Sequence, residues 1–500
     1  MLTSPRRGSA DGERGAEVEL KFLIDADQGA RLFADLRGGA RPRLRTLTSI
    51  YYDTPRHALR RSGFVLRMRG DGRSWMQTVK SRALADGRLG RGEWERAAPT
   101  ADPDVGLVRL TPAGGALPRR AILAPLFTVE VKRLSMLVDG PSATIEVSFD
   151  TGEVTAGGRA APLCELELEL KSGTPAALFD LARALSEDFA LTASFVTKAD
   201  RGFALIARSA PRAAHFEAPV LSPGLSAGDG FAAMARAAVA QIATNAAHLR
   251  ASPNSEAVHQ LRVGVRRLRA TLSVFKKVVA DGQLEAIKTE LKWLTGELDR
   301  ARNLDVFIAA KHRGPKGLAR RLRGEQAAAR ARAIDASASG RFRALLLSTF
   351  CWIETGPWTG KGAPQAQRRD GAVAEFAAKA MDRRRKKILR RGRRLADLDR
   401  RRRHKVRIQA KILRYAGEDF AQVFPDHPRR AERFLGKLKD LQETLGALND
   451  IAAGEALLAD LAKGDAASDF ARAQADRETK LIDQAQDELD DFGDAARFWL

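Results

Sequence analysis

Residue types that define several protein classes are scarce in this sequence. Its 500 residues include only two cysteines, Cys164 and Cys351, which lie far apart and fit no metal-ligand spacing. This pattern excludes a disulfide framework and favours a reducing, cytoplasmic environment. No apolar run is long enough to cross a membrane, and residues 1–15, which lack the apolar core of a signal peptide, are expected to form a disordered tail.

Aromatic residues are also scarce, at 6% with three tyrosines, whereas basic residues are in large excess. The 85 Lys and Arg against 62 Asp and Glu give a net charge of +23 and a pI near 10.5. Such an excess predicts a polyanionic partner: nucleic acid, polyphosphate or an acidic membrane surface. Binding of single-stranded nucleic acid normally uses aromatic rings between basic residues, and their scarcity here argues against that partner.

The first of two parts of the chain alternates apolar and polar residues, which is typical of β-strands. Turn residues such as Asp71-Gly72 and Asp86-Gly87 separate the strands and favour an antiparallel meander that closes on itself. Two short helices are expected at 28–36 and 176–189. The expected strands are 17–24, 48–54, 64–70, 74–80, 92–97, 127–137, 143–150 and 161–171.

The second part is expected to be all-helical, which makes the whole chain an α+β multidomain protein. Residues 208–228 contain three prolines and are predicted to be a linker. From 229 to 490, apolar residues recur at spacings of three and four, with a break at 356–365.

An internal repeat runs through the helical part. HQLRVGVRRLR begins at His259 and HKVRIQAKILR begins at His404, with basic residues at the same offsets. Asp305 and Asp450 follow their histidines at the same distance in both copies. The match predicts a duplicated helical unit, spanning about 229–355 and 366–490.

Charges of one sign gather on single faces of the expected strands. Residues two apart share a face, so Glu165, Glu167 and Glu169 line one side of a strand, and Arg67 and Arg69 line one side of another. For any one strand, a solvated face is the simpler interpretation. A solvated face normally mixes signs, however, and segregated clusters favour a polar interior that holds a cation and an anion together.

The first part resembles the CYTH domains, or triphosphate tunnel metalloenzymes. EVELK at 17–21 matches their ExExK signature, and further motifs follow in that family's order. These are YYDTP (51–55), LRMR (66–69), TVK (78–80), RGEWE (91–95), KR (132–133), EVSFD (146–150), ELELELK (165–171) and TKADRG (197–202). The resemblance covers 16–207 and implies an eight-stranded antiparallel barrel, a tunnel that binds a triphosphate and Mg²⁺ or Mn²⁺.

The resemblance also implies roles for particular residues. It places catalysis on Lys21, Glu165 and Glu167, and leaves open whether Glu165, Glu167 or Glu169 activates the attacking water. Between the neighbours Lys132 and Arg133, which face opposite ways, Arg133 matches the motif position. The implied substrate-binding residues are Lys21, Arg67, Arg69, Lys80, Arg133 and Lys198. The implied metal-binding residues are Glu17, Glu19, Asp150, Glu165, Glu167 and Glu169.

The basic residues of each repeat are expected to form a stripe along one helix face. Offsets of 0, 3, 7 and 10 fall within about 80° of arc at 100° per residue. For one such stripe a solvated face is the simpler interpretation, but its duplication favours phosphate contact. The implied polyphosphate-binding residues are His259, Arg262, Arg266 and Arg269 in the first copy and His404, Arg407, Lys411 and Arg414 in the second.

This helical part resembles the CHAD domain. The matching segments are HQLRVGVRRLR, LDRARNLDV (298–306), HKVRIQAKILRY and LGALNDI (445–451). The resemblance covers 229–490 and implies two four-helix units that face each other across a basic, polyphosphate-binding pore, with Asp305 and Asp450 orienting basic side chains or capping helices.

Together the two resemblances predict metal-dependent hydrolysis of inorganic triphosphate or short polyphosphate, coupled to polyphosphate binding. The predicted location is the cytoplasm, with association with polyphosphate granules as a further expectation. Two alternatives stay open: a non-catalytic granule protein, and an enzyme for an organic triphosphate of the adenylate cyclase or thiamine triphosphatase type. The sequence does not indicate an oligomeric state.

Overall fold

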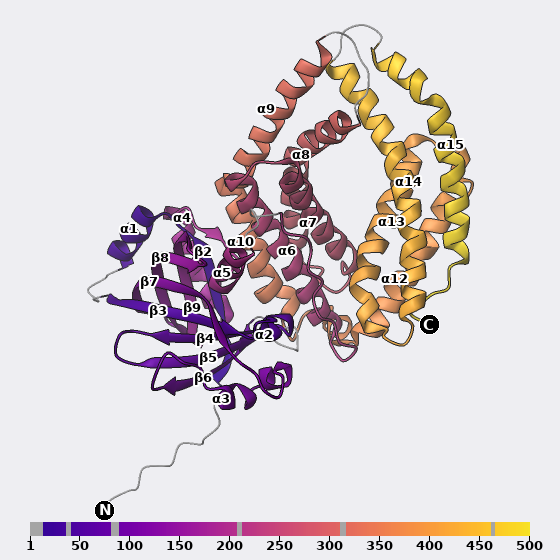
Figure 1. Cartoon of the computed structure of the whole chain (residues 1–500). Helices are drawn as coiled ribbons and strands as arrows, with labels where there is room; N and C mark the ends of the chain where they lie inside the picture. The colour runs from indigo at the N-terminus through magenta and orange to yellow at the C-terminus, as the bar shows by residue number, and fades with distance from the viewer. Residues whose placement is uncertain (1–13, 37–41, 82–89, 208–212, 311–316, 462–465) are drawn as a thin grey trace, which may run out of the picture. The chain divides into compact units, whose positions relative to one another are not determined.

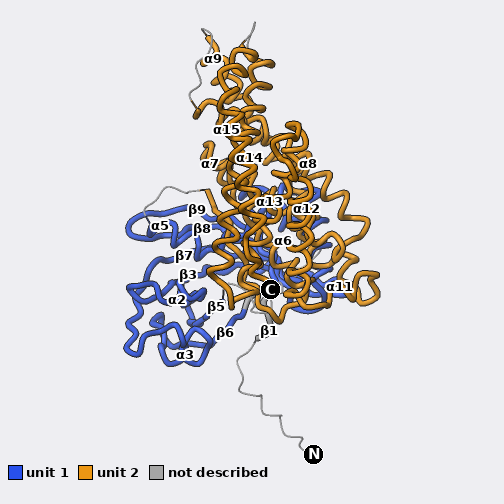
Figure 2. The backbone as a smooth tube through the Cα atoms, turned by 90° about the vertical axis from the view of Figure 1, so that its right-hand side faces the viewer, with its two compact units in different colours: residues 1–211 blue, residues 212–500 orange. Residues whose placement is uncertain are grey.

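A computed structural model of the chain describes residues 14–36, 42–81, 90–207, 213–310, 317–461 and 466–500. The chain divides into two compact units, residues 1–211 and 212–500 (Figure 2). Of the tail expected at 1–15, residues 1–13 lie outside the described residues, as does the turn expected at Asp86-Gly87, whereas Arg14 and Gly15 belong to the first strand.

The first unit is built on one antiparallel sheet, ordered β1-β6-β5-β4-β3-β7-β8-β9-β2-β10 (Figure 1). The strands are β1 (Arg14–Glu17), β2 (Glu19–Leu23), β3 (Arg43–Asp53), β4 (Phe64–Gly70), β5 (Trp75–Ser81), β6 (Arg91–Ala98), β7 (Ala124–Asp139), β8 (Ala143–Ala156), β9 (Arg159–Gly173) and β10 (Thr192–Ala193). The helical segments are α1 (Ala26–Leu36), α2 (Ala58–Arg61), α3 (Val105–Arg109), η1 (Pro112–Ala116), α4 (Pro175–Asp188) and α5 (Lys198–Ile206).

The expected eight-stranded closed barrel is wrong in strand count and in closure. The strand expected at 17–24 is interrupted at Val18, because β1 pairs with β6 whereas β2 pairs with β9. The short β10 adds a further strand beside β2. The sheet is therefore open, with β1 and β10 as its edge strands. Because β1 and β2 follow each other in the chain and β2 lies next to β10, the chain connects the two edge regions of the sheet.

Alternation explains which face of the sheet carries charge. On β4 and β5, the buried Leu66, Met68 and Val79 pack in one cluster with residues of α2, α3 and η1. Further along the sheet, helices cover the apolar side of β8 and β9 as well. The Phe149 ring of β8 lies 6.3 Å from Phe33 of α1, and α4 packs on β8 and β9. Since helices cover the apolar face, the alternate charged residues are turned to the opposite face.

The second unit is helical throughout its described residues (Figure 1). Its helices are α6 (Ala227–Ala251), α7 (Ser255–Val274), α8 (Gly282–Ala309), α9 (Leu318–Ala338), α10 (Gly340–Thr355), α11 (Ala366–Asp370), α12 (Val373–Gly392), α13 (Arg400–Phe420), α14 (Pro428–Leu461) and α15 (Ala466–Asp494). Short 3₁₀ turns are η2 (Pro357–Thr359), η3 (Leu395–Asp397) and η4 (Ala421–Val423). The break expected at 356–365 contains η2 and no α-helix.

The packing order of the helices repeats. The contacts of α6 with α7, α7 with α8 and α8 with α9 recur as α12 with α13, α13 with α14 and α14 with α15. Helices α6 and α12 begin side by side through reciprocal backbone bonds: Ala227 N–H donates to Gly371 O at 2.8 Å, and Val373 N–H donates to Leu225 O at 2.9 Å. Helices α7 and α13, which carry the two basic stripes, also pack together.

Side-chain caps start the two helices that carry the stripes. The Asn254 side chain accepts from Ala257 N–H at 2.8 Å, and the Asp399 side chain accepts from Arg402 N–H at 2.7 Å. Such caps satisfy backbone donors that have no partner within the helix. They fix where α7 and α13 begin and hence which residues share the face of each stripe.

Candidate active site and phosphate-binding cluster

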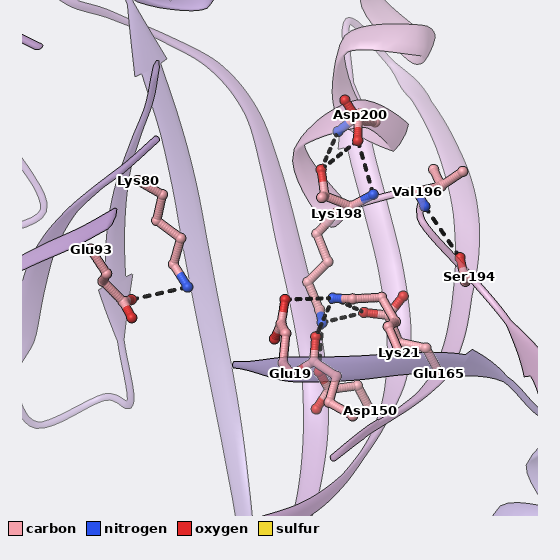
Figure 3. Close-up of polar contacts among 12 residues, drawn as sticks. Glu19, Lys21, Lys80, Glu93, Asp150, Glu165, Ser194, Val196, Lys198 and Asp200 are labelled. Carbon is pink, nitrogen blue, oxygen red and sulfur yellow. Dashed lines mark hydrogen bonds and ion pairs between the residues drawn. The ribbon is translucent and has the colours of Figure 1, made fainter. Parts of the chain in front are cut away.

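Helix α5 delivers a lysine to the charged face of the sheet. Thr197 and Asp200 form a reciprocal cap: the Thr197 hydroxyl accepts from Asp200 N–H, and the Asp200 carboxylate accepts from Thr197 N–H at 2.9 Å. The cap places Lys198 in the first turn, and its side chain points among carboxylates of the sheet (Figure 3).

Three buried carboxylates meet around that lysine. Asp150 of β8 lies opposite Glu165 of β9, and Glu167 shares the face of Glu165. Ligand atoms of all three lie within 4.8 Å of one another, and Asp150 and Glu165 are 0% exposed. The Lys198 ammonium lies 2.8 Å from Asp150 Oδ2 and 2.8 Å from Glu167 Oε1, and also contacts Glu165.

Lys21 and Arg133 complete this cluster. The Lys21 ammonium donates to Glu167 Oε1 at 2.6 Å, and Arg133 donates to Asp150 Oδ1 at 2.7 Å and to Glu167 Oε2 at 2.5 Å. Burial alone would raise the pKa of the Glu167 carboxyl, but the charges of Lys198, Lys21 and Arg133 hold it well below its usual value. Glu167 therefore stays ionised.

A second group of charges lies further along the same face. Lys80 contacts Glu93 at 3.0 Å (Figure 3). Arg67 donates to the Thr78 hydroxyl at 3.2 Å and lies 3.7 Å from Glu95. Residues of β4, β5 and β6 thus bring two of the expected phosphate-binding cations together.

Arg69 lies between the two groups and has no carboxylate partner among the described residues. Burial, with the charges of Arg67 and Arg133, lowers the pKa of its guanidinium to about 10. Its Nε atom is buried without a hydrogen-bond partner. A half-buried cation next to other cations is unfavourable by itself, and an anion bound between Arg67, Arg69 and Arg133 would neutralise it.

The structure places the remaining expected residues elsewhere or leaves them outside. Glu169 contacts Lys171 at 2.7 Å, and Lys171 in turn contacts Glu146 at 2.8 Å, away from the three buried carboxylates. Glu19 lies 3.8 Å from Lys21. Glu17 is in β1, but its side chain lies outside the described residues. Lys132 is exposed, as expected when Arg133 faces the cluster.

Two cations near the cluster were not identified from the sequence. Arg201 lies 3.8 Å from Glu165 Oε2, and Arg45 lies opposite Arg133 in the β3–β7 register. The signal for Arg201 was its position three residues after Lys198, on the same helical face. Arg45 shares the face of Arg133, because directly paired residues of antiparallel strands lie on the same side of a sheet, and its Nε atom is buried without a hydrogen-bond partner.

The three carboxylates fit a hard divalent cation. Oxygen ligands are those that Mg²⁺ and Mn²⁺ prefer, and Glu165 Oε2 is buried without a hydrogen-bond partner. The Lys198 ammonium already shows that a positive charge is held among these oxygens. Asp150, Glu165 and Glu167 are the residues that would hold the ion.

In the second unit, the stripes of α7 and α13 bring basic residues of both repeats together. Charges of Arg262 and Arg266 lower the pKa of both Arg407 and Lys411, after burial as the main cause. The Nε atoms of Arg262, Arg266 and Arg407 are buried without a hydrogen-bond partner. We call these four residues the converging cations. The opposite faces of the helices are apolar, with Leu261, Val265, Leu268 and Leu272 buried.

This crowding shifts two titrations far from their usual values. Burial, then Arg407, Arg266 and Arg262, lowers the pKa of the Lys411 ammonium to about 6. Burial, then Arg302, lowers the pKa of the His259 imidazole to about 4. In both cases burial is the largest cause, and neighbouring positive charge adds to it.

Four of the eight stripe residues also contact protein groups. Arg262, one of the converging cations, pairs with Asp299 at 2.6 Å, a residue that sequence reasoning missed although it lies within the LDRARNLDV segment. Arg269 donates to the Thr295 hydroxyl at 3.1 Å, and Arg414 donates to Gln442 Oε1 at 2.8 Å. His404 is exposed, with Nδ1 2.8 Å from Asn449 Oδ1.

The two aspartates of the repeat behave differently. Asp305 is buried and accepts from Gln326 at 2.7 Å and from Arg330 at 3.1 Å, so it orients a basic residue of α9 rather than one of the stripe. Asp450 is exposed and lies close enough to Arg407 and Lys411 to raise their pKa. The duplication is therefore not functionally exact at this position.

Comparison with known proteins identifies both units. A family model described as CYTH domain matches residues 15–203, and one described as CHAD domain matches residues 233–459. An inorganic triphosphatase of Haemophilus influenzae is 33% identical over 197 residues, or 38% of this chain and 54% of that protein. The chain spans about half the length of this curated relative.

Solved structures align with each unit. The CHAD domain of Ricinus communis is 28% identical with a TM-score of 0.49, covering 58% of this chain and 98% of that one. A Hippeastrum protein, described as an adenylyl cyclase with a dominant triphosphatase activity, is 16% identical with a TM-score of 0.26, covering 38% of this chain and 95% of that one. Within the described residues, no helix has the length and apolarity that crossing a membrane requires.

Proposed function

This chain joins a CYTH domain to a CHAD domain, and on that premise we propose that its first unit hydrolyses inorganic triphosphate and short polyphosphate. The observation that carries the proposal is the meeting of three buried carboxylates with a row of cations on one sheet face. Mg²⁺ or Mn²⁺ on the carboxylates would neutralise phosphate oxygens and raise the electrophilicity of phosphorus. The relative named inorganic triphosphatase, which matches this part of the chain, supports the choice of substrate.

The residues of the chain provide positioning and charge. Arg69, which lacks a carboxylate partner among the described residues, would bind the phosphate chain bidentately, with Arg67 and Lys80 beside it. Lys21 and Lys198 would keep Glu167 ionised and contact the phosphate at the carboxylate end. Fixed charges that face the developing negative charge are the main source of rate enhancement in phosphoryl transfer.

The second unit is proposed to bind polyphosphate through the converging cations. Three buried guanidinium nitrogens without hydrogen-bond partners and the depressed pKa of Lys411 support an anion at this place. A phosphate chain presents many oxygens and no bases, so arginine and lysine suffice without aromatic residues. Association with polyphosphate granules would follow from this binding.

The test measures phosphate release from tripolyphosphate with Mg²⁺, Mn²⁺ or excess EDTA. We expect release only with a divalent cation, and a fall in kcat of at least about 100-fold in Glu167→Gln, because a group that positions the reacting charge is lost. The matched variant His259→Ala/His404→Ala should retain turnover within about twofold while polymer binding weakens. Turnover lost in the histidine variant but kept in Glu167→Gln would overturn this division of roles.

A further inference from the structure

Apart from the converging cations, the second unit carries an exposed group of basic residues on α12. Arg383, Lys386, Arg390 and Arg391 are exposed and Lys387 is half-buried. Spacings of 0, 3, 4, 7 and 8 put these five residues on one helix face. We call them the α12 stripe. Within the part of the chain that the structure describes, none of the five forms an ion pair.

The α12 stripe is uncompensated positive charge. Burial, followed by the charges of Arg391, Arg384 and Arg390, lowers the pKa of the Lys387 ammonium, and no acidic group counters them. Like charges at these spacings destabilise a helix. An anionic partner bound along the α12 stripe would relieve this repulsion.

The corresponding helix of the first repeat has no such face. Helix α6 begins beside α12 through the reciprocal bonds described above, and it is covered by α10. The ring of Phe231 lies 5.6 Å from that of Trp352, and Arg236 donates to Glu354 at 2.8 Å. No described helix plays the role of α10 over the α12 stripe, whose outer residues remain exposed.

The α12 stripe leads toward one end of the second basic stripe. Helices α12 and α13 are antiparallel neighbours joined through η3, with Arg384 Nη1 3.4 Å from Gln409 Oε1. That alignment brings the last turn of α12 level with the first turn of α13. Exposed cations continue there: Arg401, Arg402 and Lys405 lie in the first two turns of α13 with the exposed His404, and Arg402 lies 3.4 Å from Asp399.

We propose that the α12 stripe is an external track for polyphosphate chains that extend beyond the converging cations. The proposal rests on the proposed polyphosphate binding of the second unit and extends it to a second surface. Residues 383–405 contain no Phe, Tyr or Trp on which a nucleic-acid base could stack, and no exposed large apolar residue for membrane insertion. Along the helix the track covers about 12 Å, at roughly 1.5 Å per residue.

The experiment compares binding of short and long polyphosphate, of about 10 and about 100 phosphates, to the full-length protein across a salt series. In the track variant, Arg383, Lys386, Arg390 and Arg391 are replaced by Gln. The matched control replaces four exposed cations of α14, Arg429, Arg430, Arg433 and Lys439, by Gln and loses the same charge. Poly-dT of similar length is the nucleic-acid probe.

For the track variant we expect affinity for the long chain to fall by about tenfold or more and its salt slope to fall by about 3, at roughly 0.7 per lost phosphate contact. Short-chain affinity should stay within twofold, which also verifies the fold. An unchanged long-chain affinity, an equal loss in the α14 control, or a loss seen only with poly-dT would overturn the track. Absence of any polyphosphate binding by the unmodified protein would instead overturn the proposed function.

Discussion

Arg69 is a half-buried cation whose charged neighbours include two other cations, Arg67 and Arg133. If it serves the fold, removing it should destabilise the first unit. If it binds substrate, its removal relieves repulsion by Arg67 and Arg133. The two roles therefore predict opposite effects on stability.

For Arg69→Gln we expect KM for tripolyphosphate to rise by about tenfold or more, because one charged hydrogen-bond donor to phosphate is lost. Thermal unfolding of the first unit should be unchanged or shift upward. Arg69→Lys retains the charge but cannot form two parallel hydrogen bonds to a phosphate, and it should therefore give an intermediate KM. A lower unfolding temperature with unchanged KM would assign Arg69 to the fold.

Lys411 provides a pH-dependent readout of anion binding. Its pKa of about 6 in the free protein means that it is mostly neutral at pH 7.5. Bound phosphate would raise that pKa toward its ordinary value, so the complex holds more protons than the free protein. Polyphosphate affinity should therefore fall as pH rises from about 6 to 9, by up to about tenfold per pH unit for one proton.

Calorimetry in buffers of different ionisation enthalpy measures the proton uptake directly. We expect about one proton per site near pH 7.5, disappearing in Lys411→Arg, which stays charged throughout this range. His259, whose pKa is about 4, contributes below this window. An identical uptake in Lys411→Arg would contradict the assignment.

Helix α5 illustrates how one packing contact positions a site residue. A Cβ atom at Gly202 would lie 2.1 Å from the Phe127 ring, which is itself held 4.5 Å from Tyr51 in a stacked pair. Gly202→Ala should therefore push α5 outward and move Lys198 from the carboxylates. We expect a loss of stability of about 1–3 kcal/mol, together with reduced kcat.

Urea unfolding and tripolyphosphate turnover test this contact. Gly115→Ala is the control, because nothing lies within 4 Å of its Cβ position and its backbone tolerates a side chain. It should stay within about 0.5 kcal/mol of the unmodified protein. Unchanged stability and turnover in Gly202→Ala would show that α5 tolerates displacement.

The resemblance to CYTH domains named most residues of the cluster, and its motif position selected Arg133, which the structure has beside Asp150 and Glu167. Alternation along the strand then required Lys132 to face away, as it does. It could not separate Glu169 from its neighbours, since that residue shares their face and differs only in having Lys171 as a partner. The alternation pattern could not predict the break at Val18. The residues before it pair with β6 and those after it pair with β9, and this choice is made by the tertiary arrangement of the strands.

Helical periodicity was similarly informative in the second unit. It predicted the stripe face and the buried Leu261 and Leu268 opposite to it. It could not reveal that stripes separated by more than a hundred residues lie near each other, nor that Arg269 and Arg414 contact protein groups. Those facts depend on how α7 and α13 pack with each other and with α8 and α14, which no local spacing encodes.

Across the whole chain, the excess of positive charge is distributed unevenly between the two units. In the first unit several cations are matched by buried carboxylates, as Lys198 and Arg133 are. In the second unit the converging cations and the α12 stripe carry much of the imbalance. The net charge of +23 therefore describes a molecule with a partly neutralised charged face on the sheet and a strongly positive helical unit.

The reciprocal backbone bonds between Leu225–Ala227 and Gly371–Val373 join the first helices of the two repeats at their starts. A chain nicked after the exposed Lys361 should consequently travel as one particle in size-exclusion chromatography and come apart only in denaturant. Two separately eluting fragments would mean that the covalent link between the repeats, rather than these backbone hydrogen bonds, holds the two repeats together.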